Sequence, residues 1–136
     1  MGLFDLRMYD YIVDAMDTVS SKILLIEQAG KYKVPVISCL SMGDKLDPSR
    51  LEIMDISRVA ADSATKKMRA ELRKRGVRRL KVICSREHSH RGFEFRKIKP
   101  SVEKNVQGSI SFVAGVAGLM TAGEVVRDIL AEKYKK

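Results

Sequence analysis

The chain has 136 residues, the length of one domain that can bury a hydrophobic core. Its composition, with 45% hydrophobic and 32% charged residues, is that of a globular protein and excludes a disordered tail. No uninterrupted apolar run reaches the ~18 residues of a membrane span, and the amino terminus lacks the basic-then-apolar order of a signal peptide. We therefore expect one soluble, cytoplasmic domain over residues 1–136, with no membrane partner.

The net charge of +9 is concentrated in one segment of the chain. Residues 66–104 contain fifteen Lys and Arg against four acids, whereas the remainder sums to −2. Such a concentration is typical of proteins that bind a phosphate-rich partner, although a solvated surface produces the same pattern. The residues that we expect to contact nucleic acid are Arg73, Arg75, Arg78, Arg79, Arg86 and Arg91.

The predicted elements of the first half begin with a strand and a helix. A short apolar run at 10–15 predicts a buried strand of the parallel type. Helical spacing follows, and it predicts a helix with Asp17 as its N-cap and a stop at Gly30. Residues 34–40 predict the next strand. Turn-forming residues at 42–49 then separate it from a further strand at 50–56.

The second half of the chain continues the alternation of helices and strands. A basic amphipathic helix is predicted at 63–75, ended by Gly76, and a strand at 80–84. A polar loop at 86–107 precedes a last helix that opens at Ser109. The glycines at 108, 115, 118 and 123 predict close approach of this helix to a sheet or to another helix. The order βαβ, β, α, β, α predicts an α/β fold with helices layered on a sheet.

Several segments carry a resemblance to a known family. The string YDYIVDAMDTVSSK at 9–22 resembles the Asp-box of the ThiF/MoeB/HesA superfamily of ATP-dependent adenylating enzymes. The segments KVPVIS, MGDKLDP, MRAELRKRG and GSISFV resemble one branch of it, the tRNA threonylcarbamoyladenosine dehydratases (TcdA). The resemblance covers the chain from about residue 10 to residue 129.

The resemblance implies an incomplete Rossmann-like fold of the ThiF type, with three layers. Asp17 matches the aspartate that lies beside the ATP phosphates and helps to hold magnesium, so it is the implied catalytic residue and metal ligand. Asp14 is expected to support the same site. The family's Gly-rich phosphate loop belongs to a preceding, amino-terminal half, and no G-x-G-x-x-G occurs here. We therefore expect ATP and Mg in the complete enzyme and no cofactor in this chain alone.

Zinc is not expected. The sulfur-carrier activators of the superfamily carry two C-x-x-C pairs for a structural zinc, whereas Cys39 and Cys84 are 45 positions apart. His88 and His90 could face one side of a strand, but two ligands without a third do not make a zinc site. Cys84 is either an activated thiol or a small buried hydrophobe.

Three functions remain open on the sequence. The first is the carboxyl-terminal part of a TcdA-like enzyme, which the resemblance implies would adenylate the threonylcarbamoyl carboxylate on a tRNA adenosine and close it to a cyclic ester. The others are activation of a ubiquitin-like or sulfur-carrier protein, and a non-enzymatic RNA-binding or scaffold module. We further expect a homodimer, because the strand at 11–13 would lack its amino-terminal neighbours and the Gly/Ala-rich helix offers a smooth face.

Overall fold

The computed structural model describes residues 4–60, 62–88 and 108–134. Their strands and helices follow the predicted order, which is thereby confirmed. They are β1 (Ile12–Asp14), α1 (Val19–Tyr32), β2 (Val36–Cys39), β3 (Leu51–Asp55), α2 (Ser63–Lys74), β4 (Lys81–Ser85) and α4 (Ser111–Tyr134). Short 3-10 turns occupy Leu6–Met8, Pro48–Arg50 and Ile56–Arg58. Most of the loop predicted at 86–107 lies outside the described residues.

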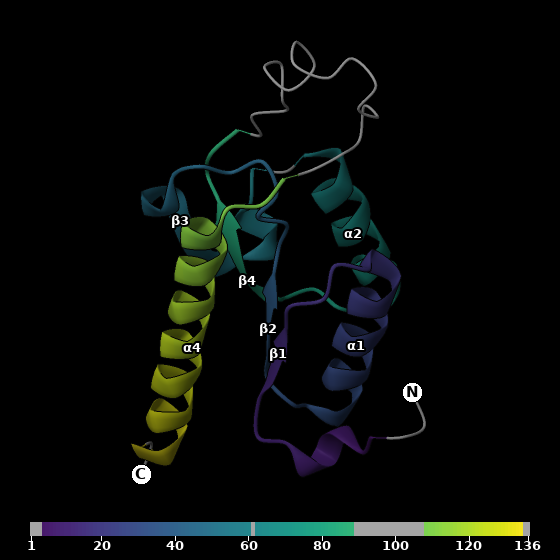
Figure 1. Ribbon diagram of the computed structural model, residues 1–136. Helices are drawn as coiled ribbons and strands as arrows, with labels where there is room; N and C mark the ends of the chain where they lie inside the picture. The colour runs from purple at the N-terminus through teal and green to yellow at the C-terminus, as the bar shows by residue number, and fades with distance from the viewer. Residues whose placement is uncertain (1–3, 61, 89–107, 135–136) are drawn as a thin grey trace.

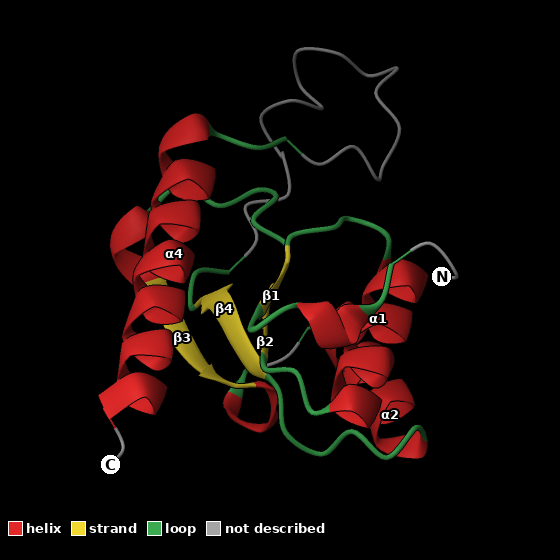
Figure 2. Ribbon diagram, turned by 90° about the horizontal axis from the view of Figure 1, so that it is seen from below, coloured by secondary structure: helices red, strands yellow, loops and turns green. Residues whose placement is uncertain are grey.

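The four strands form one mixed sheet in the order β1-β2-β4-β3. β1, β2 and β4 are parallel, and β3 runs antiparallel to β4. Figures 1 and 2 show the sheet as a middle layer, with α1 and α2 on one face and α4 on the other. The layered α/β fold expected from the sequence is therefore present, and β1 is an edge strand among the described strands.

The boundaries of α1 differ from the prediction at both ends. Thr18, and not Asp17, occupies the N-cap position. The helix also continues past Gly30 to Tyr32. It ends at Lys33, which adopts the left-handed conformation (φ 56°) and donates its N–H to the carbonyls of Ala29 and Gly30. A lysine thus performs the termination that the sequence assigned to a glycine.

The boundaries of α2 agree with the prediction. The carboxylate of Asp62 caps the helix by accepting from the backbone N–H of Thr65 at 2.8 Å. Gly76 follows the helix at φ 82°, a conformation that glycine adopts without steric cost.

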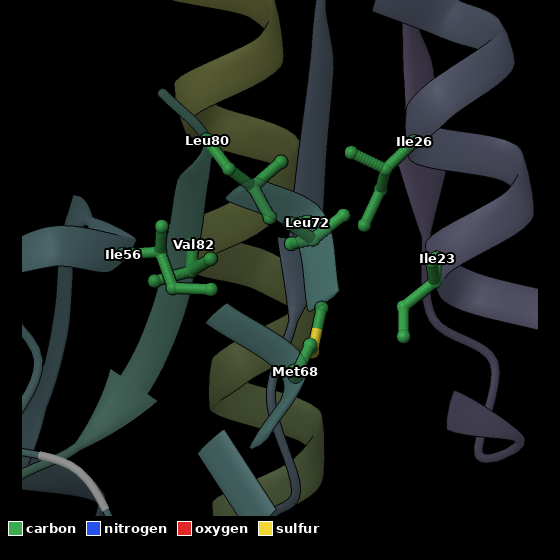
Figure 3. Packing of buried hydrophobic residues seen from close by; sticks show 7 residues of the cluster. All are labelled: Ile23, Ile26, Ile56, Met68, Leu72, Leu80 and Val82. Carbon is green, nitrogen blue, oxygen red and sulfur yellow. The ribbon is translucent and has the colours of Figure 1, made fainter. Parts of the chain in front are cut away.

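Three hydrophobic clusters among the described residues join the helices to the sheet, and one of them joins α1 to β1. Figure 3 shows the largest one between α1, α2 and β4. Successive residues of β4 divide between the clusters, since Val82 packs beneath α1 and α2 while Ile83 packs beneath α4. The members of the largest cluster are Ile23, Ile26, Ile56, Met68, Leu72, Leu80 and Val82.

The glycines of α4 do not have the role predicted for them. A Cβ built at Gly115 or Gly118 has no neighbour within 4 Å, and one at Gly123 meets only the side chain of Arg127. The helix contacts the sheet through Val113 and Ala117 instead. Within the described chain, close backbone approach therefore does not explain these glycines.

A polar network joins the carboxyl-terminal half of α4 to the sheet. The Nζ of Lys81 lies 2.8 Å from Glu124 and 2.6 Å from Asp128. The hydroxyl of Tyr11 donates to Asp128 at 2.7 Å. Partial burial and the bond to Asp128 raise the pKa of Tyr11. Partial burial opposes ionisation of Asp128, but the hydrogen bonds from Lys81 and Tyr11 outweigh it and lower the pKa of this carboxyl.

Replacing Lys81 with Met leaves Glu124 and Asp128 without their shared cation. We expect the free energy of unfolding to fall by about 1 kcal/mol at neutral pH. Both carboxyls have lowered pKa values in the folded protein, so the stability they contribute is present above their ordinary pKa and is lost as the pH falls through the folded values. The difference from wild type should therefore shrink below about pH 4.

Urea unfolding at a series of pH values measures this difference. Lys67→Met, at an exposed position of α2, is the matched control and should change little. A deficit in the Lys81 variant that is the same at neutral and acidic pH contradicts the role given to the network.

Candidate functional site

A buried ion pair lies where β1 and β2 end and α1 begins. The carboxylate of Asp14 and the ammonium of Lys22 are 2.9 Å apart, and both side chains are buried. Asp14 also accepts from the hydroxyl of Ser38 on β2 at 2.5 Å. Lys22 donates in addition to the carbonyls of Met16 and Cys39, at 2.9 and 2.8 Å. All three ammonium hydrogens therefore have acceptors, which is what makes a buried lysine tolerable.

The same pair fixes the link between β1 and α1. The backbone N–H of Met16 donates to Asp14 at 3.1 Å, while its carbonyl accepts from Lys22. Met16 is thus held from both sides. Asp17 follows it directly and is exposed, without a hydrogen-bond or ion-pair partner in the described part of the chain. We expected the two aspartates to support one site, and the structure gives them different surroundings. Asp14 is buried inside the link, whereas Asp17 is exposed at its surface.

The loop after β2 is held at the same edge of the sheet. The carboxylate of Glu87, which follows β4, accepts from the backbone N–H groups of Leu46 and Asp47 at 3.0 and 2.8 Å. Asp44, at φ 59°, donates its N–H to the carbonyl of Gly108 and accepts from the Gly108 N–H. The segments that follow β2 and β4 and the one that precedes α4 are therefore tied together.

This edge has the geometry of a ligand site. In sheets with parallel strands, ligands bind outside the carboxyl ends of the strands, where the connecting loops meet. An exposed carboxylate on a rigid link is a suitable oxygen ligand for a hard cation that bridges phosphate oxygens. Asp17 meets this requirement, and Asp14 and Lys22 supply the rigidity.

The basic residues predicted to contact nucleic acid have different surroundings. Arg75 pairs with Glu27 and Glu71, at 2.9 and 3.0 Å, and Arg86 pairs with Glu52. Arg73, Arg78 and Arg79 are exposed and have no ion-pair partner among the described residues, while Arg91 lies outside them. The described members of the predicted basic set therefore divide into two with acidic partners and three without.

The cysteines and histidines do not form a site in the described chain. Burial raises the pKa of the Cys84 thiol, with Glu52 adding to the effect, so the thiolate is disfavoured. The thiol lies 3.7 Å from the Glu52 carbonyl. His88 is exposed and His90 is not among the described residues. Residues 4–60, 62–88 and 108–134 contain no group of three or more side chains able to hold a metal ion.

Two residues of this edge were missed by the sequence reasoning. Lys22 ends the Asp-box string, but its local pattern is that of an ordinary lysine in the first turn of a helix. Glu87 occurs in a polar stretch and its partners lie about forty positions earlier in the chain. A signal existed only for Lys22, because the mainly apolar face of α1 that carries Ile23 and Ile26 also carries this one charge.

Comparison with known proteins relates the chain to one group of enzymes. No family model matches it. The tRNA threonylcarbamoyladenosine dehydratase of Bacillus subtilis is 36% identical over an alignment of 133 positions that covers 90% of this chain and 52% of that protein. The tRNA threonylcarbamoyladenosine dehydratase 1 of Saccharomyces cerevisiae is 40% identical over 78 residues, 57% of this chain and 18% of that protein.

Solved structures show the same fold. The crystal structure of Escherichia coli TcdA superposes with a TM-score of 0.78 at 19% identity, covering 94% of this chain and 51% of that one. The same enzyme in complex with ATP gives a TM-score of 0.76 at 19% identity and the same coverage.

No helix in the described ranges is long and apolar enough to cross a membrane. The chain spans about half the length of the Bacillus relative and of the E. coli structures. The resemblance predicted from the sequence is confirmed: over most of its length this chain is homologous to about half of a tRNA threonylcarbamoyladenosine dehydratase.

Proposed function

We propose that this chain supplies the carboxyl-terminal part of a TcdA-like, ATP-dependent site that activates the threonylcarbamoyl carboxylate of a modified tRNA adenosine and closes it to a cyclic ester. The observation that carries the proposal is the exposed Asp17 on the link held by Asp14 and Lys22, at the carboxyl edge of the parallel strands. The 36% identity to the Bacillus dehydratase supports it. Its place of action would be the cytoplasm, where tRNA is found.

The chemistry explains why ATP is needed. A carboxylate is a poor electrophile, and joining it to AMP as a mixed anhydride, with release of pyrophosphate, makes its carbonyl carbon reactive. Ring closure then expels AMP, so the water lost by the nucleoside is accounted for by ATP cleavage. In this scheme Asp17 would hold a magnesium ion that neutralises the phosphate oxygens. The phosphate loop would come from the amino-terminal half.

A chimera tests this function. This chain replaces its aligned segment in the Bacillus subtilis dehydratase, and release of AMP is measured with ATP and tRNA that carries threonylcarbamoyladenosine. We expect tRNA-dependent AMP release and the cyclic product by mass spectrometry, with neither from this chain alone. Asp17→Asn should lower the rate by on the order of 10²-fold or more, because the metal loses a charged ligand.

Asp10→Asn is the control, since Asp10 is exposed next to the other end of β1. A chimera that is folded by circular dichroism yet makes no product overturns the proposal. AMP release that requires a small carrier protein instead of tRNA would assign the chain to the carrier-activating branch.

We also propose a homodimer. Val13 on the edge strand β1 is half exposed, and Phe112, Leu119 and Val126 are exposed on α4. Apolar residues spaced by seven positions form one stripe along a helix, and a two-fold axis is the commonest way to cover such a stripe with a second copy.

Light scattering at micromolar concentration should give about twice the 15.3 kDa mass of the chain. Leu119→Lys should shift the mass towards the monomer, because Leu119 is 75% exposed in the stripe. Leu24→Lys on α1 is the control and should remain dimeric. A wild-type chain with the monomer mass contradicts the dimer.

A further inference from the structure

A groove runs along the outer face of α2, away from the sheet. It has a volume of about 340 Å³ and is lined by Val59, Lys66, Arg69, Ala70 and Arg73. The three cations stand at positions i, i+3 and i+7 of one helix, so they share one face. Apolar Val59 and Ala70 complete the lining. The groove is therefore cationic at three points with no acid among its lining residues.

These cations differ from the other basic residues of the helix in having no acidic partner. Arg75 pairs with Glu27 and Glu71, and Lys74 lies 3.8 Å from Glu71. Lys66, Arg69 and Arg73 form no ion pair within the described part of the chain. Their charge is therefore not neutralised locally and remains available to an anion from solution.

Arg69 is held in a fixed position within the groove. Its two terminal guanidinium nitrogens donate to the carbonyls of Ser57 and Val59, each at 3.2 Å. Its Nε is buried and has no acceptor. A cation that is anchored by backbone carbonyls keeps its full charge and has already lost its conformational freedom, which favours binding of an anion.

We infer that the groove of Lys66, Arg69 and Arg73 binds successive phosphate groups of an RNA backbone. The span from Lys66 to Arg73 is seven residues, or about 10 Å along a helix. A nucleic-acid strand carries one phosphate for about every 3.4 Å of axial rise, so three cations over this length match a strand better than a single small anion. Phosphate contacts of this kind position the RNA and read no sequence.

The Lys66 end of the groove lies towards the edge of the sheet that carries Asp17. α2 ends where the chain returns to the start of β4, so its first turns, with Lys66, lie towards the carboxyl ends of the parallel strands. Figure 1 shows the beginning of α2 at that end of the molecule. An RNA held on α2 would have its modified nucleoside on the side of the proposed site. The choice of RNA as the polyanion rests on the proposed function.

Salt-dependent binding of fluorescently labelled tRNA to this chain tests the inference. The double variant Lys66→Gln/Arg73→Gln removes two cations and leaves the anchored Arg69 in place. At about 0.1 M salt its Kd should rise on the order of tenfold, and the slope of log K against log salt should become shallower by about 1 to 2 units.

The matched control is Lys67→Gln/Lys74→Gln, which removes the same charge from the same helix outside the groove. Its Kd should change by less than about twofold. Circular dichroism confirms that each variant is folded. Equal weakening in both double variants, or no tRNA binding by wild type, overturns the inference.

Two further arms separate other anions from RNA. Inorganic phosphate at matched ionic strength should compete only weakly, and vesicles containing phosphatidylserine should not bind. Tight competition by phosphate, or vesicle binding in place of tRNA binding, overturns the inference. These readouts need no catalysis. If the chimera is inactive but the Lys66/Arg73 double variant still weakens tRNA binding, the proposed function is refuted and phosphate binding by the groove is not.

Discussion

The buried pair of Asp14 and Lys22 is the interaction on which the candidate site depends. It joins β1, β2 and α1 through one carboxylate and one ammonium, with Ser38 and two backbone carbonyls completing the hydrogen bonds. Two unpaired charges at this depth would each cost several kcal/mol, which only such complete pairing offsets. A simple hydrophobic contact would hold the helix equally well. The pair additionally fixes Met16 from both its N–H and its carbonyl, and so determines where Asp17 stands.

The two charged surfaces of the molecule are built differently, and we propose that they serve different partners. The link at Asp17 is negative and rigid, and suits a metal ion bound to phosphates. The groove on α2 is positive, and its three cations lie on one helix face over about 10 Å of helix length. The link at Asp17 and the Lys66 end of the groove lie towards the carboxyl edge of the parallel strands. The proposed substrate is a polyanion with one reactive nucleoside, so one surface would bind its backbone and the other would act on the nucleoside.

Much of the fold could be predicted because its signals are local. Apolar runs identified the strands, and α2 was bounded correctly because Asp62 and Gly76 satisfy the ends of the helix within a few residues. The structure adds most to the prediction where distant residues decide the outcome. The ion pair of Arg75 with Glu27, 48 positions earlier, was not foreseen. Lys22 was overlooked because its acceptors come from two strands and a loop. The groove was not predicted because it depends on a contact between α2 and the turn at 56–58, where Arg69 donates to the carbonyl of Ser57.

If the buried pair positions Asp17, then replacing both partners together must damage the site without unfolding the protein. The variant Asp14→Asn/Lys22→Met removes both charges and keeps comparable volumes, a change that is often neutral for stability. The decisive measurement is the magnesium dependence of AMP release by the chimera that carries this variant. A folded protein with a raised magnesium requirement and a rate lowered by about tenfold or more is the result predicted. A folded variant with the wild-type rate and magnesium dependence would contradict it.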